Sequence, residues 1–548
     1  MLERLNRLEP SLKALTFCLY PLVYYWLDIL NYSQAGKAGV LGFFTLATFF
    51  YWRELVPRRR YLTILLILGM VIFAVNVAFE ASVRDIFGMQ QDDVVVIQSI
   101  FSTNTDEATE FFIQYGRYIG FHAAVVLVFC LLYWLLFIKD GNDSRSRREH
   151  KSSTRLIFVT AVVTFLLVAV HFNPAMRRGN PLYYFPHYYL IWQRDLAQAR
   201  DFQKTLADTV NDKNLQSMHL LPGVQARTVV FVIGESDTRN DWSLYGYPRD
   251  TNPELARLQD GLLIFRDTYS GDGSTIGSVT KMLTPATMTS PDLWKTRPTI
   301  VTMAKKLGYK VIWVTNQGTE NRGIVSVMAS LADDVVFVNK GGSRSEGSFD
   351  GAVLGPYDQA LDDPAEKKFI VVHILGAHPS YNFRYPENYA RFENDFDDKV
   401  ARELKNKGRS SWAISFRNMY DSALYYEDHV LAQLLSHLES RQTPAAWMYI
   451  SDHGQDVAHN TNFSGHNRSV RQMWEVPMLV WSSADFDASP VDPAKLIQRP
   501  YQADVIDHTI LGLLGARGDY YQPQLDVLSA NYDPERFSKR HTSIKQKR

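Results

Sequence analysis

Hydrophobic residues are concentrated in the first third of the chain, where they form five apolar stretches. These stretches cover residues 15–31, 40–52, 61–79, 119–138 and 156–172. An α-helix needs about 20 apolar residues to cross a bilayer, and the last three stretches approach that length. The second stretch is short enough to be a re-entrant segment or a buried helix. The pattern predicts a multi-pass α-helical membrane domain at the N-terminus.

Basic residues flank these stretches in a consistent order. They precede the first stretch, follow the second at Arg53 and residues 58–60, and separate the fourth from the fifth within residues 139–155. Short cytoplasmic segments of membrane proteins are enriched in Lys and Arg. This rule predicts five spans, with the N-terminus in the cytoplasm and the C-terminal part outside. Residues 173–192 carry clustered Tyr, Phe and Trp, which is typical of a segment in the headgroup layer.

From residue 228 onward, short β-type runs alternate with helical periodicity. Strands are expected at residues 228–234, 310–315, 335–339, 368–375, 446–451 and 476–481, and helices near 299–307, 415–440 and 502–514. Such alternation predicts an α/β domain with a largely parallel sheet and helices on both faces. The expected divisions are a transmembrane domain at 1–172, an interfacial and bridging segment at 173–225, a catalytic α/β domain at 226–532 and a basic, disordered tail at 533–548.

Charge and cysteine content narrow the possible functions. The 58 basic and 58 acidic residues cancel, so composition gives no reason to expect nucleic acid as a partner. Both cysteines, Cys18 and Cys130, lie in the apolar stretches. The α/β region can therefore hold neither a disulfide nor a thiolate metal site.

Acidic residues follow two of the predicted strands. Glu235 ends the run TVVFVIGE, and Asp452 and His453 follow the run AWMYIS. In open α/β sheets, ligands bind at the carboxyl ends of the strands. Carboxylate oxygens and imidazole nitrogens are ligands of catalytic divalent metals. The sequence therefore predicts a metal site at this edge of the sheet.

A glycine-rich segment, SGDGSTIGSVTKML at residues 270–283, leads into a helical pattern at Ser274 and Thr275. A hydroxyl there could be an ordinary N-cap. However, a helix N-terminus also attracts phosphate, and a nearby metal can turn a hydroxyl into a nucleophile. The acidic residues on neighbouring strand ends favour this second interpretation.

Further polar residues follow other strands. Asn316 ends one strand, His378 follows another, and His466 lies in the loop that continues from His453. We interpret the two histidines as phosphate or second-metal ligands on the edge that carries the acidic residues. His459 lies in the same loop as His466 and is the alternative to it, whereas His373, inside a strand, is expected to be part of the core.

With these motifs, the chain resembles the bacterial inner-membrane phosphoethanolamine transferases of the alkaline phosphatase/sulfatase superfamily, which modify lipopolysaccharide. The resemblance covers nearly the whole chain and favours the branch that modifies the lipopolysaccharide core. The matching segments are GES through PEL (234–255), TNQ (315–317), HILGAHPSYNFRYPE (373–387), YDSALYYEDHV (420–430) and YISDHG with the later GH.

The resemblance implies roles for individual residues. It implies zinc bound by four residues and Thr275 as the nucleophile; the zinc ligands would be Glu235, Thr275, Asp452 and His453. It also implies that His378 and His466 contact the phosphoethanolamine or a second zinc, and Asn316 is expected to bind the substrate. In the outer loop, Ser99, Thr103 and Glu107 resemble a donor-lipid pattern that usually begins with Asn, so Thr103 and Glu107 are expected to bind the donor.

The implied reaction moves phosphoethanolamine from phosphatidylethanolamine to a core sugar or lipid A of lipopolysaccharide, through a phosphoethanolamine-threonine intermediate at the periplasmic face of the inner membrane. Alternatives are a membrane-anchored phosphatase or sulfatase, a phosphoglycerol transferase and a catalytically inactive scaffold. Sulfatases need a Cys or Ser at the nucleophile position, where this chain has Thr275. The matching motifs favour phosphoethanolamine over phosphoglycerol, and the complete ligand set disfavours the scaffold.

Overall fold

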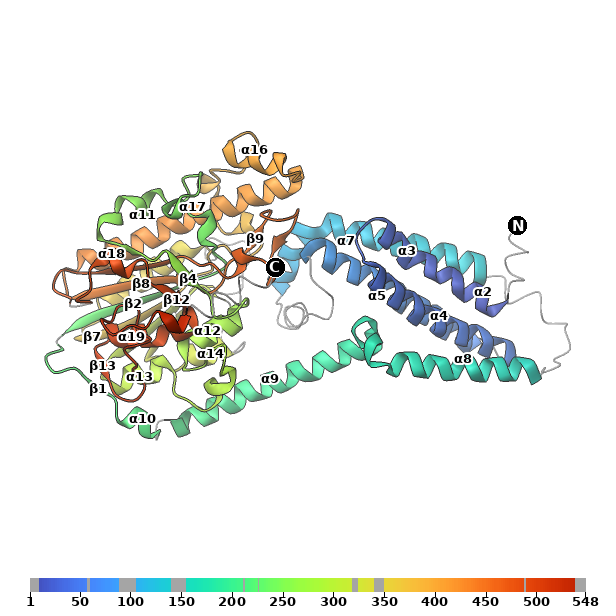
Figure 1. Cartoon of the computed structure of the whole chain (residues 1–548), viewed down its shortest axis with the longest axis horizontal. Coiled ribbons are helices and arrows are strands. Elements are labelled where there is room, and N and C mark those ends of the chain that lie inside the picture. The colour runs from blue at the N-terminus through green and yellow to red at the C-terminus, as the bar shows by residue number, and fades with distance from the viewer. Residues whose placement is uncertain are drawn as a thin grey trace. The chain divides into compact units, whose positions relative to one another are not determined.

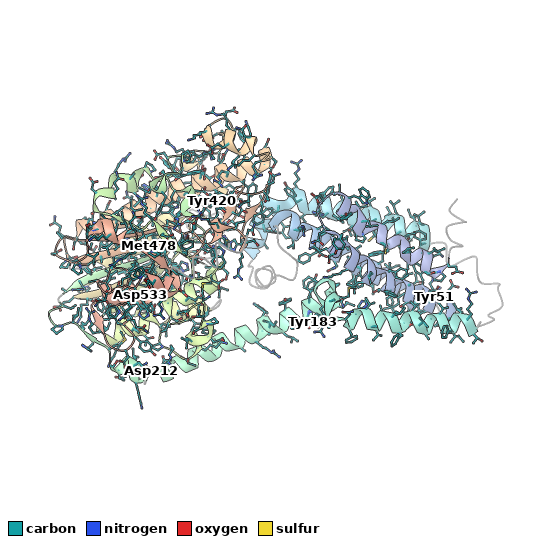
Figure 2. The ribbon with its side chains drawn as sticks, viewed as in Figure 1. Tyr51, Tyr183, Asp212, Tyr420, Met478 and Asp533 are labelled. Atoms are coloured by element: carbon teal, nitrogen blue, oxygen red, sulfur yellow. The ribbon has the colours of Figure 1, made fainter. Side chains whose placement is uncertain are left out.

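The computed structural model describes residues 9–56, 60–87, 105–138, 154–209, 212–224, 226–317, 324–339, 349–486 and 489–537 (Figure 1). The chain divides into two compact units, Met1–Arg194 and Asp195–Arg548. Figure 2 shows the side chains along both units, with Tyr51 and Tyr183 in the first and Tyr420 and Met478 in the second.

The first unit is helical. Its elements are α2 (Pro10–Leu15), η1 (Thr16–Cys18), α3 (Leu19–Trp26), α4 (Tyr32–Leu55), α5 (Arg60–Phe87), α7 (Thr105–Tyr133), the π-helical turn η2 (Trp134–Ile138) and α8 (Thr154–Phe172). Among the described residues, three helical segments are long and apolar enough to cross a membrane: Arg60–Arg84, Tyr115–Ile138 and Thr154–Phe172. The count of five spans stays a prediction.

The first two apolar stretches fold differently from their hydropathy pattern. The first forms short helical pieces that end at Trp26, and Asp28 follows with a left-handed φ of 58°. The second belongs to a longer helix, α4, which begins at Tyr32 behind a capping box. In that box the Gln34 N–H donates to Asn31 Oδ1 over 2.9 Å, and the Asn31 N–H donates to Gln34 Oε1 over 3.1 Å. Small and polar residues in the first two turns of α4 hide its length from a hydropathy pattern.

Residues 173–225 contain η4 (Pro174–Gly179), α9 (Pro181–Thr209), α10 (Lys213–Gln216) and β1 (His219–Leu220). The division between the two units falls inside α9. The Arg177 guanidinium lies 5.0 Å from the centroid of the Tyr183 ring at the start of this helix. β1 pairs with β13 (Ala516–Arg517), so the end of this segment is built into the second unit. Its placement at the membrane interface stays a prediction.

The second unit is built on a seven-stranded sheet of order β3-β11-β8-β2-β7-β5-β6. These strands are β3 (Leu263–Ile264), β11 (Met478–Ser482), β8 (Ala445–Ser451), β2 (Arg227–Gly234), β7 (Lys367–His373), β5 (Lys310–Thr315) and β6 (Asp334–Phe337). The five strands from β8 to β6 run parallel, whereas β11 is antiparallel to both β8 and β3. The sheet is therefore mixed, with its parallel part where the sequence predicts the site.

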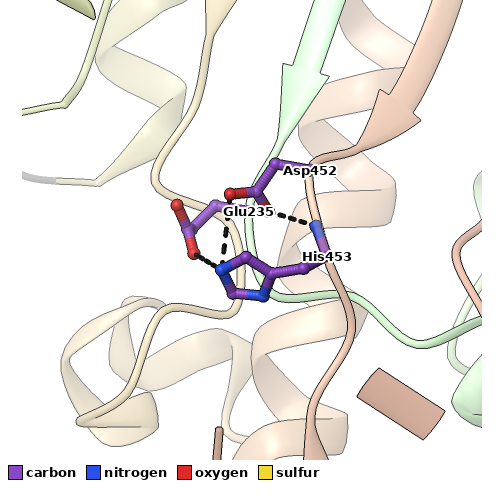
Figure 3. A group of neighbouring side chains, drawn as sticks. All are labelled: Glu235, Asp452 and His453. Atoms are coloured by element: carbon purple, nitrogen blue, oxygen red, sulfur yellow. Dashed lines mark hydrogen bonds and ion pairs between the residues drawn. The ribbon is translucent and has the colours of Figure 1, made fainter. Parts of the chain in front are cut away.

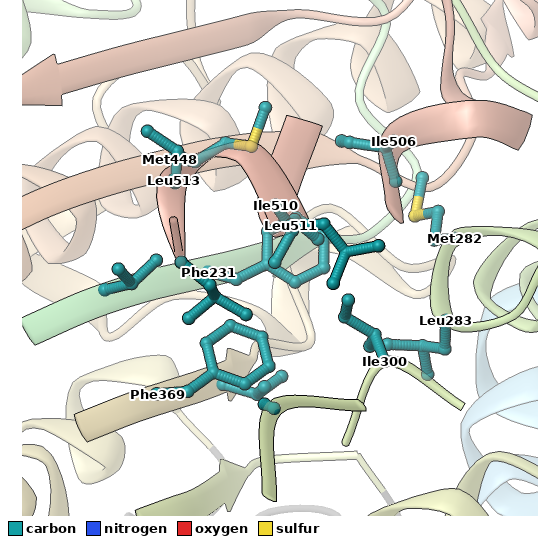
Figure 4. Packing of buried hydrophobic residues seen from close by; sticks show 14 of the residues in the cluster. Phe231, Met282, Leu283, Ile300, Phe369, Met448, Ile506, Ile510, Leu511 and Leu513 are labelled. Carbon is teal, nitrogen blue, oxygen red and sulfur yellow. The ribbon is translucent and has the colours of Figure 1, made fainter. Parts of the chain in front are cut away.

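Helices cover both faces of this sheet (Figure 1). One face carries α12 (Thr275–Leu283), α13 (Ile300–Lys306), α14 (Ile324–Ala329) and α19 (Ile506–Leu513), and the other carries α11 (Pro253–Arg257), α15 (Leu354–Leu361) and α17 (Ser411–Ser440). The strands are apolar on both sides because both are covered. Figure 4 shows Phe231, Phe369 and Met448 of the strands packed against residues of α12 and α19.

Smaller elements complete the second unit: β4 (Asp267–Tyr269), α16 (Lys399–Asn406), β9 (Asp456–Val457), β10 (Ser464–Gly465), α18 (Pro493–Leu496) and β12 (Pro500–Gln502). The predicted boundary of the disordered tail is wrong by a few residues. Phe537 is fully buried and stacks on Tyr532 with a centroid distance of 5.9 Å, so the core extends to this residue. Residues 538–548 lie outside the described part of the chain.

Candidate active site

Strand pairing brings the three predicted acidic and imidazole ligands together. β2 and β8 are parallel, and Gly234 lies opposite Ser451 in their register. The next residues, Glu235 on one side and Asp452 with His453 on the other, are therefore neighbours (Figure 3). All three side chains are completely buried. One ligand atom from each lies within 4.8 Å of the others, a spacing suitable for a shared metal ion.

The ring of His453 has a fixed orientation. Its Nδ1 lies 3.0 Å from the Gly454 carbonyl oxygen, so this nitrogen carries the proton and donates it. Its Nε2 lies 3.4 Å from Glu235 Oε1 and 3.4 Å from Asp452 Oδ2. Metal-binding histidines commonly donate their second ring N–H in this way. Nε2 is therefore free to bind a cation together with the two carboxylates.

The two carboxylates lie close together in an environment with little solvent. Burial, with the neighbouring Asp452 charge, raises the pKa of Glu235 to about 8, and burial raises the pKa of Asp452 to about 7. Asp452 Oδ1 accepts hydrogen bonds from the Ser236 and His453 backbone N–H groups over 3.1 and 2.6 Å. Its buried Oδ2 has no hydrogen-bond partner among the described residues. A bound cation would satisfy this oxygen and balance both charges.

Thr275, the first residue of α12, completes this group. Its Oγ1 donates to Glu235 Oε2 over 3.0 Å and lies 3.3 Å from His453 Nε2. The preceding Ser274 has a different partner, because its Oγ donates to Asp272 Oδ1 over 3.1 Å. The sequence pattern alone left Ser274 and Thr275 as alternative candidates for the nucleophile, and the family resemblance favoured Thr275. In the structure, Thr275 is the one of the two that contacts Glu235.

Two other serines fix the start of α12. The hydroxyls of Ser270 and Ser278 both donate to the main-chain carbonyl of Asp452, the latter over 2.6 Å. Ser270 precedes the helix and Ser278 lies in its first turns, so α12 is attached to the end of β8 from both sides of Thr275.

His466 and His378 lie near His453. The rings of His453 and His466 have a centroid distance of 4.6 Å. Burial lowers the pKa of His378 to about 3, and burial with the positive electrostatic influence of His453 lowers the pKa of His466. Both are therefore neutral imidazoles. His459 lies elsewhere, with Nε2 3.0 Å from Asp241 Oδ1 and 2.8 Å from Arg417 Nη2. Of the two loop histidines, the structure brings His466 to the site.

Two further residues contact Glu235, and the sequence analysis assigned neither of them a role. The Gln317 Nε2 donates to the Ile374 carbonyl over 2.8 Å and lies 3.4 Å from Glu235 Oε2. The Ser236 Oγ donates to Glu235 Oε1 over 2.7 Å. Both lie in segments that match the family, Ser236 in GES and Gln317 in TNQ, and each directly follows a residue that was selected.

The remaining predicted residues lie away from this group or outside the described structure. The Asn316 amide donates to Asp350 Oδ1 over 2.8 Å, so it supports the loop after β7. Its contact with substrate stays a prediction. Thr103 lies outside the described residues, and Glu107 lies in α7 with a side chain that is not described.

Comparisons with known proteins find relatives of this chain. A family model described as Sulfatase matches residues 227–516. The phosphoethanolamine transferase EptC of Escherichia coli (strain K12) is 29% identical over 504 residues, which cover 86% of this chain and 84% of that protein. The phosphoethanolamine transferase CptA of Salmonella typhimurium is 30% identical over 500 residues, which cover 85% and 82%.

Solved structures extend the comparison to both units. The periplasmic domain of Escherichia coli EptC, in complex with Zn, is 34% identical with a TM-score of 0.54, and the match covers 58% of this chain and 90% of that domain. The integral membrane lipooligosaccharide phosphoethanolamine transferase A of Neisseria meningitidis has a TM-score of 0.67 over 95% of this chain and 98% of that protein. At 19% identity it supports the fold alone.

The chain belongs to the sulfatase family, as its matched domain and its metal-type site at the strand ends show. Within that family it is a member of the phosphoethanolamine transferases, because its similarity to CptA extends over most of both chains. The resemblance inferred from the sequence motifs is thereby confirmed.

Proposed function

We propose that this protein transfers phosphoethanolamine from phosphatidylethanolamine to a core sugar or lipid A of lipopolysaccharide, through a phosphoethanolamine ester of Thr275. The position of the Thr275 hydroxyl carries the proposal. It is the one hydroxyl that contacts both Glu235 (3.0 Å) and His453 (3.3 Å) among the described residues, and it lies at the positive end of α12. The names of the relatives EptC and CptA support the transferred group.

We assign one zinc ion to Glu235, Thr275, Asp452 and His453. Three features favour this assignment: the unpartnered Asp452 Oδ2, the free Nε2 of His453 and the two buried carboxylates. A set of oxygen and imidazole ligands suits zinc. When bound, zinc would lower the pKa of a hydroxyl and stabilise negative charge on a phosphate. The zinc complex of the EptC domain agrees with this choice.

The first half-reaction forms the ester on Thr275. A new bond joins Thr275 Oγ1 to the phosphorus of phosphatidylethanolamine, and the bond from phosphorus to the glycerol oxygen breaks. Glu235 Oε2, which accepts the hydrogen bond of Oγ1, takes the threonine proton. Water supplies a proton to the departing oxygen, which lies opposite Oγ1, so diacylglycerol leaves as an alcohol and Glu235 releases the threonine proton to solvent.

The second half-reaction discharges the ester. An acceptor hydroxyl attacks the phosphorus, the bond to Thr275 Oγ1 breaks, and the hydroxyl proton returns to Oγ1. His466 is neutral, so it can donate a ring N–H to a phosphate oxygen without repelling the ammonium group of ethanolamine. The N–H of neutral His378 is at Nδ1, 3.3 Å from the Pro379 carbonyl oxygen, so its Nε2 can accept a hydrogen bond from the ammonium group.

We place this chemistry at the periplasmic face of the bacterial inner membrane. Five spans and a cytoplasmic N-terminus follow from the positions of the basic residues. The aromatic start of α9 suits the headgroup layer, where the phosphate of the donor lies. Thr103 and Glu107 remain the proposed donor-lipid contacts.

Intact-mass measurement of the purified full chain with phosphatidylethanolamine tests the proposal. The wild type should gain the mass of one phosphoethanolamine, Thr275→Ala should gain none, and Ser274→Ala, its neighbouring hydroxyl control, should gain it. A phosphoglycerol adduct from phosphatidylglycerol would instead indicate a phosphoglycerol transferase. Release of phosphate products without an adduct would indicate a phosphatase and contradict the proposal.

A further inference from the structure

A charged group of three residues lies directly beside the proposed nucleophile. Arg468 Nη2 lies 2.6 Å from Asp272 Oδ1 and 3.4 Å from Ser274 Oγ, the residue before Thr275. Lys281 Nζ lies 2.7 Å from the other oxygen, Asp272 Oδ2. The loop that carries His466 thus also brings a guanidinium to the residue that precedes the proposed nucleophile.

Two glycines make room for this arrangement. A Cβ at Gly273 would lie 2.9 Å from Arg468 Cγ, so the arginine side chain packs against the bare backbone of the loop. A Cβ at Gly277 would lie 2.5 Å from Asp272 Cγ, so the carboxylate folds back over the first turn of α12. Larger residues at either position would displace these side chains. The glycine-rich segment therefore fixes the position of Arg468 as well as that of Thr275.

The group has an unbalanced positive charge. Two cations share one carboxylate, and Lys281 and Arg468 together lower the pKa of Asp272, so it is ionised. Lys281 is nearly buried, whereas the Arg468 side chain is 42% exposed. Both hydrogen bonds of its guanidinium within the described part of the chain use Nη2. Nη1 has no hydrogen-bond partner among the described residues, so the guanidinium keeps N–H groups that can bind an anion from solvent.

We propose that Arg468 is a specificity-determining residue that binds a phosphate or carboxylate on the acceptor sugar, next to the hydroxyl that receives phosphoethanolamine. This inference rests on the proposed function. The position of Arg468 favours contact with the acceptor over contact with the donor lipid. Glu235, Asp452 and His453, three of the four proposed zinc ligands, are completely buried, whereas the Arg468 side chain is 42% exposed.

The test separates the two half-reactions of the full chain in detergent. The enzyme is first loaded with phosphatidylethanolamine, and transfer is then followed to a phosphorylated heptose disaccharide and to the same disaccharide without phosphate. Variants are Arg468→Ala, Arg468→Lys and the control Arg297→Ala. Arg297 is similar to Arg468 in exposure, 39%, and it also pairs with an aspartate, Asp212.

We expect Arg468→Ala to reduce the preference for the phosphorylated acceptor, as a ratio of kcat/KM values, by about tenfold or more, mainly through KM. Arg468→Lys should keep part of the preference, and Arg297→Ala should keep all of it. An unchanged ratio in Arg468→Ala would overturn the inference. Slower loading from phosphatidylethanolamine, with an unchanged ratio, would also overturn it and assign Arg468 to the donor phosphate.

Different results would contradict the proposed function and the inference about Arg468. If the wild type forms no adduct, the proposed function fails and the inference fails with it. If the wild type loads and transfers normally but the acceptor ratio does not depend on Arg468, only the inference fails. Zinc content and melting temperature, measured for each variant, should match the wild type.

Discussion

The Ser278 hydroxyl donates a hydrogen bond of 2.6 Å to the main-chain carbonyl of Asp452. This contact joins the helix that begins with the proposed nucleophile to the strand end that provides two proposed metal ligands. Both residues are completely buried. The distance between Thr275 and the carboxylates therefore depends on a side chain that itself has no chemical role.

Ser278→Ala should weaken both the fold and the reaction. A buried hydrogen bond contributes about 1 kcal/mol, and an unsatisfied carbonyl costs about 1–3 kcal/mol, although Ser270 still donates to the same oxygen. We expect a loss of about 1 kcal/mol in unfolding free energy and slower adduct formation on Thr275. Urea unfolding and time-resolved intact mass measure the two effects. Ser330→Ala, which removes a 2.7 Å hydrogen bond at the exposed residue that follows α14, should change neither.

Metal removal should make stability depend on pH. The raised pKa values of Glu235 (about 8) and Asp452 (about 7), from ordinary values of 4.5 and 3.8, mean that the metal-free folded state binds more protons than the unfolded state. Its stability should therefore fall as pH rises from about 4 to about 8. Zinc replaces those protons, so the loaded protein should lose less stability.

Thermal unfolding of chelator-treated and zinc-loaded protein across this pH range checks the prediction. Zinc binding near neutral pH should also release protons, which calorimetry in two buffers of different ionisation enthalpy would detect. If the melting temperatures of the chelator-treated and zinc-loaded proteins changed with pH in the same way, the assigned ligand set would be contradicted.

The acidic site could be predicted from the sequence because its residues follow parallel strands directly. Glu235 and Asp452 each directly follow a short, largely apolar strand. The register between these two parallel strands brings the two residues side by side. The choice between His459 and His466 could not be made, because both lie in one loop whose path no periodicity fixes. Arg468 was missed for the same reason, since its position depends on space left by Gly273.

The membrane unit shows another limit of hydropathy patterns. α4 is 24 residues long, yet its apolar run predicts only residues 40–52. Its first turns contain small residues such as Ala35 and Ala38, which are buried between helices rather than exposed to lipid. A hydropathy pattern indicates which residues can contact lipid. The length of α4 depends instead on packing between helices and on the N-cap at Asn31.

Gln317 offers a test of how Glu235 is oriented. Its amide donates to the Ile374 carbonyl over 2.8 Å and faces Glu235 Oε2 at 3.4 Å. Removing a residue that orients a metal ligand typically lowers metal affinity by about 10–100-fold. We expect Gln317→Leu to lower zinc affinity in this range, as measured by competition with a chelator. The exposed Gln259→Leu is the control, and equal affinities in the two variants would show that Gln317 does not orient Glu235.

Arg249, within the segment 234–255 that matches the family, should act on stability rather than on chemistry. Its guanidinium lies 2.6 Å from Asp421 Oδ2, 2.7 Å from Asp398 Oδ2 and 2.8 Å from Asn418 Oδ1, and it thereby attaches the loop after β2 to α17. Removing one partner of a buried ion pair costs about 3–5 kcal/mol, because the other charge remains buried. Arg249→Met should lower the unfolding free energy by about this amount, and Arg249→Lys should recover only part, since lysine cannot form the forked contacts. Urea unfolding measures both.

The double variant Arg249→Met with Asp421→Leu should be more stable than Arg249→Met alone, because it removes the carboxylate that has lost its arginine partner. Equal stabilities of the two variants would contradict this explanation.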